Sequence, residues 1–241
     1  MHNFTEAFKF IGRNGQIQGG PHVPTLVHLT LGTLKIAGIG VALALVIALP
    51  IGLWLGHIHR GSFLAINLGN IWRALPSLAV LAIGVAFLGL GLGNVELALI
   101  VLAVPPVITN AYVAIDEVDR DVVDAARGMG MSGWEILRKV EVPLGIPLIF
   151  AGIRTAALFV VSTTTIAALT GYGGSLGDII NNEASYHLSG VLGAAICIAA
   201  LALLTDLLLA GVQRLFTARG VSLEKHPARQ EALGPPLAEN I

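Results

Sequence analysis

Asp124-Ala125-Ala126, Gly130 and Val140-Glu141-Val142-Pro143 mark a polar segment that lies between two long apolar stretches of the chain. Each neighbouring stretch has enough apolar residues to cross a bilayer as a helix, which takes about 17–25 residues. A polar segment held this close to a membrane either joins two spans or presents a docking surface to a soluble partner. The regular pattern of its residues favours docking.

The composition indicates a protein whose surface faces lipid. Of the 241 residues, 55% are hydrophobic and only 12% are charged, and the mean hydropathy is +0.80. A soluble domain carries about 25% charged residues. The formal net charge of -1 and the lack of a basic face argue against a nucleic-acid partner.

The residues give no sign of catalytic chemistry. The single cysteine, Cys197, lies in an apolar run and excludes an internal disulfide or a metal site built from cysteines. The chain contains neither a G-x-x-x-x-G-K-[ST] phosphate loop nor an H-E-x-x-H metal motif. We therefore expect no enzyme activity, no metal and no cofactor in this chain.

Five apolar segments predict an all-α, polytopic membrane protein with five transmembrane helices. Helices are expected because lipid offers backbone groups no other hydrogen-bond partner. The predicted spans are residues 34–55, 62–90, 95–115, 147–169 and 188–215. They belong to a membrane domain of residues 25–216, which lies between a polar N-terminal segment (1–24) and a tail (217–241) that is expected to be disordered.

Lysine and arginine predict the orientation of the spans, because they are enriched in cytoplasmic loops. The loops 89–94 and 170–187 contain neither residue, whereas one side of the membrane would hold Arg60, Arg120, Arg127, Arg138, Lys139 and Arg214. This bias places the N-terminus outside, and the C-terminus and the loop 116–143 in the cytoplasm. Lys9 and Arg13 in the N-terminal segment weaken the bias slightly.

The first half of the loop 116–143 predicts a short helix followed by a turn. Asp121 stands at the start of this helix, where the helix dipole favours an acidic side chain. Gly130 suits a turn with a positive φ. The small pair Ala125-Ala126 would let another surface approach the helix closely.

The second half of the loop predicts another helix. Ser132 and Glu135 match a capping box that opens a helix over residues 134–140. Pro143 is expected to end it, because proline lacks a backbone N–H. The whole loop is thus expected to be a helical hairpin.

Two ionisable residues inside the predicted spans need a partner, because a charge at the bilayer centre costs about 2.5–3.5 kcal/mol on insertion scales. Arg154 lies about 16 Å along its span from Pro143, and Asp206 lies about 12 Å from Arg214. Both distances start at the cytoplasmic end, so we predict that the two side chains form a structural ion pair. Alternatively, Arg154 extends to the interface and Asp206 is satisfied elsewhere in the core.

The spacing Asp124-Ala125-Ala126-x3-Gly130-x9-Val140-x-Val142-Pro143 resembles the signature loop of ABC importer permeases, Glu-Ala-Ala-x3-Gly-x9-Ile-x-Leu-Pro. The three departures, at Asp124, Val140 and Val142, are conservative. Residues 48–52, 75–79 and 151–156 are similar to the glycine betaine/choline osmoprotectant branch of this MetI-like, binding-protein-dependent transport family. The similarity extends over roughly residues 25–215.

The resemblance implies a type I ABC importer permease fold in which the loop 116–143 is a coupling-helix hairpin. The residues implied to contact an ATPase are Asp124, Ala125, Ala126, Gly130, Trp134 and Pro143. The expected partners are a second permease subunit, identical or paralogous, two cytoplasmic ATPase subunits that bind ATP and Mg, and an extracytoplasmic binding protein. The expected location is the inner membrane of a bacterium.

The resemblance also implies alternating-access import of an osmoprotectant such as glycine betaine, choline or carnitine. Permeation of amino acids or another small nutrient is an alternative, and a secondary carrier or a channel is a more remote one. The candidates to line the path are Ser77, Asn110, Ser162, Thr163, Thr164 and Thr165. Such side chains form hydrogen bonds between helices at least as commonly.

Overall fold

The computed structural model describes residues 2–15, 24–61, 63, 67, 69–70, 76–170 and 173–217, and every regular element within them is helical. The all-α prediction is therefore confirmed. In chain order the elements are α1 (His2–Gly12), α2 (Leu26–His57), α4 (Ser77–Leu88), α5 (Leu92–Asp116), α6 (Arg120–Gly128), α7 (Gly133–Ile136), the π turn η1 (Leu137–Glu141), α8 (Val142–Ala167), the 3-10 turn η2 (Ala168–Thr170), α9 (Gly177–Ile180) and α10 (Glu183–Phe216).

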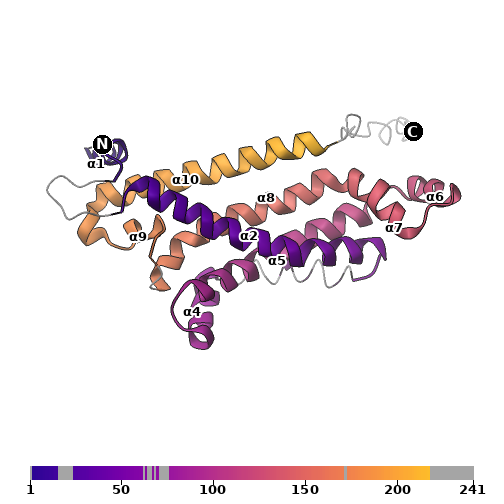
Figure 1. Cartoon of the computed structure of the whole chain (residues 1–241), viewed down its shortest axis with the longest axis horizontal. Coiled ribbons are helices and arrows are strands. Elements are labelled where there is room, and N and C mark those ends of the chain that lie inside the picture. The colour runs from indigo at the N-terminus through magenta and orange to yellow at the C-terminus, as the bar shows by residue number, and fades with distance from the viewer. Residues whose placement is uncertain are drawn as a thin grey trace, which may run out of the picture.

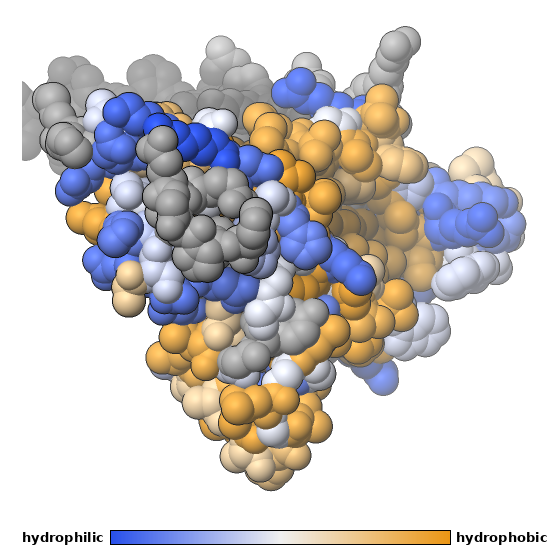
Figure 2. Space-filling model, turned by 60° about the vertical axis from the view of Figure 1, so that its left-hand side comes forward, coloured by the Kyte–Doolittle hydropathy of each residue, from blue (hydrophilic) through white to orange (hydrophobic). Residues whose placement is uncertain are grey.

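Four helical segments among the described residues are long and apolar enough to cross a membrane: Leu26–His57, Leu92–Asp116, Gly133–Thr170 and Glu183–Phe216. They run along the long axis of the molecule, and α2, α5 and α8 pack against one another (Figure 1). The hairpin of α6 and α7 projects from one end, and α1 and α9 lie at the other. Apolar side chains gather between these polar ends (Figure 2), so the chain is a membrane-integral protein.

The second predicted span, residues 62–90, is described only in part. Its described part includes α4, an apolar helix of 12 residues that begins after Pro76 and ends before Gly89. Twelve residues cover about 18 Å, less than the roughly 30 Å of bilayer hydrocarbon. Most of residues 62–75 lie outside the described residues, as does the tail beyond Thr217, so the full span and the disordered tail stay predictions.

Small residues bring α2 and α5 into close contact. They recur at every fourth position of α2, which puts them on one face, and all are buried: Gly40, Ala44, Ala48, Gly52 and Gly56. A Cβ built on Gly52 would lie 2.7 Å from the Cβ of Ala111, and one built on Gly56 would lie 2.7 Å from the Cβ of Ile115. Only glycine permits this approach, which is how membrane helices gain packing without a hydrophobic driving force.

The prediction that Pro143 ends the second hairpin helix is wrong. The π turn η1 joins α7 to α8, and the combined helix runs without a break from Gly133 to Thr170. Pro143 follows the π turn directly and lacks the N–H that other residues of a continuous helix donate. The wider π turn shifts the hydrogen-bond register ahead of this proline. The hairpin and the membrane helix are therefore one continuous element.

Candidate functional site

Capping hydrogen bonds define both ends of α6, the first helix of the hairpin. At its start, the Asp119 carboxylate accepts a hydrogen bond from the N–H of Asp121 at 2.9 Å. At its end, the N–H of Gly130 bonds the carbonyl of Arg127 at 3.0 Å, and the N–H of Met131 bonds that of Ala126 at 3.3 Å. These two bonds form a Schellman motif, which needs a residue with positive φ. Gly130 supplies it with φ of 85°.

The predicted capping box is present at the start of α7. The N–H of Glu135 donates to the Ser132 hydroxyl at 3.4 Å, and the Glu135 carboxylate accepts from the N–H of Ser132 at 3.1 Å. Lys139 donates to the same carboxylate at 2.9 Å. The bond from Lys139, followed by those from Ser132, lowers the pKa of Glu135 to about 2. The stability this carboxylate contributes is present above pH 4.5 and is lost as the pH falls toward 2.

Ser132→Ala is expected to destabilise the hairpin locally by about 1 kcal/mol, because it removes the cap of α7. Amide hydrogen exchange of residues 133–136 should then rise about fivefold, while exchange in α5 stays unchanged. Ser132→Asp, which keeps an acceptor at the cap, is the matched control and should exchange like the wild type. Equal exchange in Ser132→Ala and the wild type would mean that tertiary packing alone holds α7.

A small apolar core holds the two hairpin helices together. Its buried residues are Val118, Val123, Ala126 and Ile136, and Met131, Val140 and Leu144 pack against them. Ala126 is therefore an interior residue of the hairpin. Of the predicted small pair Ala125-Ala126, only Ala125 is open to a partner.

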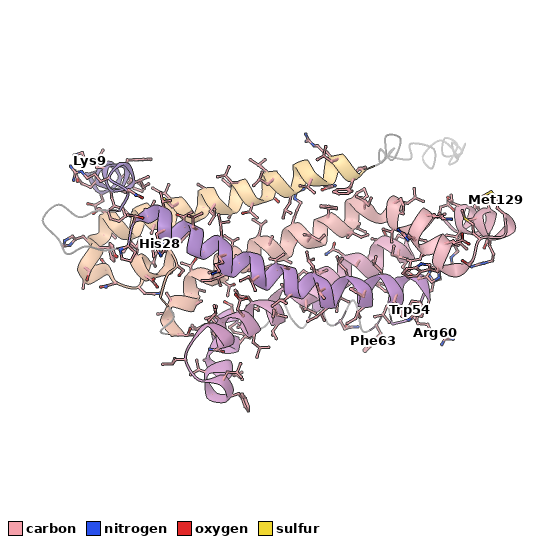
Figure 3. All side chains as sticks on the ribbon, in the orientation of Figure 1. Lys9, His28, Trp54, Arg60, Phe63 and Met129 are labelled. Carbon is pink, nitrogen blue, oxygen red and sulfur yellow. The ribbon has the colours of Figure 1, made fainter. Side chains whose placement is uncertain are left out.

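The outer face of α6 carries an exposed apolar stripe, which we define as Val122, Ala125 and Met129. These residues lie three and four positions apart, so they share one side of the helix. Met129 is 74% exposed and points away from the rest of the molecule at the tip of the hairpin (Figure 3). Asp124 and Arg127 lie on the side of α6 away from the stripe and pair at 2.9 Å. Sequence reasoning missed Val122 and Met129, although their spacing from Ala125 was a signal.

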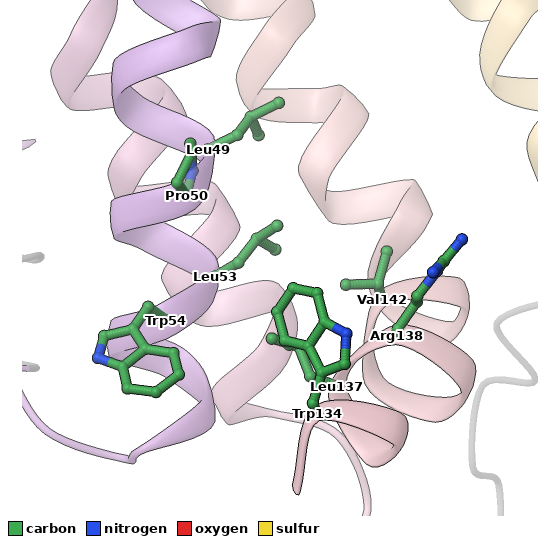
Figure 4. Close-up of a pocket in the computed structure, with 8 residues that line it drawn as sticks. All are labelled: Leu49, Pro50, Leu53, Trp54, Trp134, Leu137, Arg138 and Val142. Atoms are coloured by element: carbon green, nitrogen blue, oxygen red, sulfur yellow. The ribbon is translucent and has the colours of Figure 1, made fainter.

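Trp134 lies on a different surface from the apolar stripe. Its ring is directed into a pocket of about 610 Å³ between the end of α2 and the start of α8 (Figure 4). The lining is almost entirely apolar and consists of Leu49, Pro50, Leu53, Trp54, Trp134, Leu137, Arg138 and Val142. The residues that the resemblance assigns to an ATPase contact thus lie on more than one face of the hairpin.

Two histidines at the end of α2, for which the sequence predicts only an interfacial position, tie this helix to its neighbours. His57 Nδ1 lies 2.7 Å from a carboxylate oxygen of Glu141 in the π turn. His59 Nδ1 lies 2.7 Å from a carboxylate oxygen of Asp116 at the end of α5. The Glu141 residue is only 1% exposed, so His57 is the group that satisfies a buried acid. The His57 ring also contacts the position of Gly133, whose Cβ would lie 3.2 Å from Nε2.

His57→Ala is expected to destabilise the hairpin by about 1–3 kcal/mol, because it leaves the buried Glu141 carboxylate without its partner. The matched control is His59→Ala, which breaks a pair of similar length whose side chains are 40% and 35% exposed and should cost about 0–1 kcal/mol. Amide exchange of α7 in the purified chain measures both. Equal losses in the two variants would contradict the importance of burial.

Arg154 of α8 and Asp206 of α10 form the predicted ion pair. The guanidinium donates two hydrogen bonds of 2.7 Å, from Nε and Nη2, to the two carboxylate oxygens. This bidentate geometry makes the strongest kind of side-chain contact available to these groups. It joins the middle of α8 to the C-terminal half of α10.

The candidate path residues differ in how accessible they are. Thr164 is fully buried, and its hydroxyl donates to the carbonyl of Val160 at 2.7 Å. Asn110 donates to the carbonyl of Pro106 at 2.7 Å, next to Gly152. Ser162 is exposed, Ser77 and Thr165 are half-buried, and Thr163 is buried. Among the described residues, no three His, Cys, Asp or Glu side chains gather to hold a metal ion.

Most of the chain is similar in sequence to permease proteins named for the compounds they transport. It is 36% identical over 197 residues to the glycine betaine/carnitine/choline transport system permease protein OpuCB of Bacillus subtilis, covering 81% of this chain and 90% of the relative. It is 34% identical to the choline transport system permease protein OpuBB of the same species, with the same coverage. It is 36% identical to the carnitine transport permease protein OpuCD of Listeria monocytogenes over 73% of this chain and 79% of that relative.

Solved structures share the fold. An inward-facing form of the MetNI methionine ABC transporter matches with a TM-score of 0.69 at 22% identity, over 80% of this chain and 96% of the other. An amino acid ABC transporter with histidines matches with a TM-score of 0.62 at 19% identity, over 90% and 98%. The model of one family, described as the binding-protein-dependent transport system inner membrane component, matches residues 31–219. The chain belongs to this family of ABC importer permeases.

Proposed function

We propose that the chain is one permease subunit of an ATP-driven importer and that its hairpin receives the ATPase. The observation that carries this proposal is the exposed apolar stripe of Val122, Ala125 and Met129 at the tip of the molecule. Apolar side chains in such a position gain stability when a partner removes them from water. Asp124 and Arg127 lie on the other side of α6 and would meet the ATPase only where it wraps around the helix; such charged contacts contribute specificity more than affinity.

The hairpin faces the cytoplasm and the N-terminus lies outside in this proposal. Five of the six positive residues used to predict the orientation lie at or near the hairpin end of the molecule: Arg60, Arg120, Arg127, Arg138 and Lys139. Lys9 lies at the opposite end (Figure 3). The excess of positive charge at one end supports the cytoplasmic assignment of that end.

The full importer would contain a second permease subunit, two ATPase subunits that bind ATP and Mg, and an extracytoplasmic binding protein. Closing of the ATPases would displace the hairpin, and the continuous helix from Gly133 to Thr170 would carry that displacement into the membrane. The path between the two permeases would then open to one side at a time. ATP hydrolysis belongs to the ATPase subunits, and this chain performs no chemistry.

The cargo in this proposal is an osmoprotectant such as glycine betaine, choline or carnitine, as the printed names of the relatives suggest. Aromatic cages hold quaternary ammonium groups tightly. Tyr112 and Tyr186 are both buried in the core of the chain and cannot form such a cage. Selectivity would then come from the binding protein, and the path would bind its cargo weakly through exposed polar groups such as Ser162.

The test is reconstitution of the chain with its ATPase and binding protein in vesicles, followed by uptake of radiolabelled glycine betaine, choline and carnitine. We expect uptake that stops when ATP is omitted. Uptake of amino acids but none of these three compounds would overturn the cargo. Uptake that needs an ion gradient and no ATP would overturn the importer itself.

A further inference from the structure

The N-terminal helix α1 has two different apolar sides. Ala7 and Phe10 are buried where α1 packs against α10. Phe4 and Phe8, one turn apart on a neighbouring side, are 56% and 62% exposed. Lys9 lies on the remaining side and pairs with Glu6 at 2.8 Å. The contact with α10 therefore buries one apolar side of α1 and leaves the other exposed.

The fold holds α1 in place at two points. The Phe10 ring packs edge-on against Tyr186 with ring centroids 6.2 Å apart, and it covers Gly193, whose Cβ would meet it at 2.9 Å. Beyond the helix end, Asn14 accepts hydrogen bonds from the N–H groups of Leu26 and Val27, each at 3.0 Å. The direction in which Phe4 and Phe8 point is therefore set by the rest of the chain.

The placement of α1 matches the surface of a bilayer. It lies at the end opposite the hairpin and is seen nearly end-on in Figure 1, whereas the long helices run across the same view. A bilayer crossed by the long helices would thus have α1 lying in its plane. A helix with aromatic residues on one side and charges on the other lies stably at the boundary between lipid headgroups and acyl chains.

The small area of the exposed patch formed by Phe4 and Phe8 favours insertion into lipid over contact with a protein partner. Two phenylalanine rings offer at most about 250 Å² each. A stable protein interface needs about 800 Å² from each partner. The two rings fall short of that area, but insertion into lipid has no such threshold, because each ring gains from leaving water separately.

We propose that α1 is an interfacial anchor, with Phe4 and Phe8 inserted among lipid acyl chains and Lys9 in water. The anchor would hold the end of α10 at which His187 breaks the helix with φ of 56°. Phe10 contacts Tyr186 and lies beside Gly190, so it touches α10 on both sides of this kink. The proposal stands whichever compound the chain transports.

The experiment uses the full chain in vesicles of phosphatidylethanolamine and phosphatidylglycerol. Cys197→Ser removes the single native thiol, and a nitroxide is then attached at Phe8→Cys or, as the matched control, at Lys9→Cys. Collisions with oxygen report on lipid, and collisions with a water-soluble nickel chelate report on water. We expect oxygen to dominate at position 8 and the nickel chelate to dominate at position 9, with at least a fivefold difference in the ratio of the two collision rates.

Two results would overturn the proposal. Equal ratios at the two positions would mean that Phe8 faces water as Lys9 does. A label at position 8 that meets oxygen only weakly, and becomes immobilised when a soluble binding protein is added, would assign the patch to a protein partner. Circular dichroism of each labelled chain checks that the helices remain folded.

Discussion

Asp206→Ala is expected to lower the free energy of unfolding, because it leaves the Arg154 guanidinium without a counter-ion between two membrane helices. The variant loses both hydrogen bonds of the pair, each 2.7 Å long. Arg154→Ala should cost a similar amount by stranding the carboxylate. Thermal or denaturant unfolding of the purified chain in detergent measures the loss.

The double variant Arg154→Ala/Asp206→Ala is the control for this pair. It removes both charges at once and should cost less than the sum of the single losses. Arg154→Lys keeps the charge but loses the two-point contact, so it should fall between the wild type and Arg154→Ala. Strictly additive losses would show that the two side chains act independently.

Gly130→Asp is expected to reduce ATP-driven uptake at least about tenfold, because an unpaired charge at an interface costs about 2 kcal/mol or more. No atom lies within 4 Å of the position a Cβ would take, so the side chain fits. The positive φ of 85° is tolerated by aspartate better than by most residues. Uptake by reconstituted vesicles, with membrane insertion checked by protein recovery, measures the effect.

Gly130→Asn is the matched control, because asparagine has the same shape and the same tolerance of positive φ without the charge. It should retain most of the uptake. Co-purification of the ATPase with each variant would show whether docking or a later step has failed. Full uptake in Gly130→Asp would contradict a role for this turn in docking.

Local sequence signals predicted the parts of the structure that local interactions determine. Long apolar runs predicted the membrane helices, because a helix is the structure in which one segment satisfies all its backbone hydrogen bonds in lipid. Ser132 and Glu135 predicted the capping box, because both partners lie within one helical turn. Arg154 and Asp206 could be paired because a charge in a span needs a nearby opposite charge, and depth along each helix narrows the choice.

The features that the sequence did not predict depend on contacts between distant segments. His57 and Glu141 are 84 residues apart, and neither shows locally that the other is near. Ala126 looked available to a partner, but Ile136 of the second helix helps to bury it. Pro143 looked like a stop, and the π turn that lets the helix pass through it has no composition signal of its own.

The unbroken helix from Gly133 to Thr170 joins the hairpin directly to the membrane core. Its 38 residues extend over about 57 Å at 1.5 Å per residue. A tilt of about 5° at the hairpin would swing the opposite end through an arc of about 5 Å, close to one helical pitch. The π turn, Pro143 and Pro147 lie near the hairpin end of this helix, so bending there sets how much of a push on the hairpin reaches the far side of the bilayer.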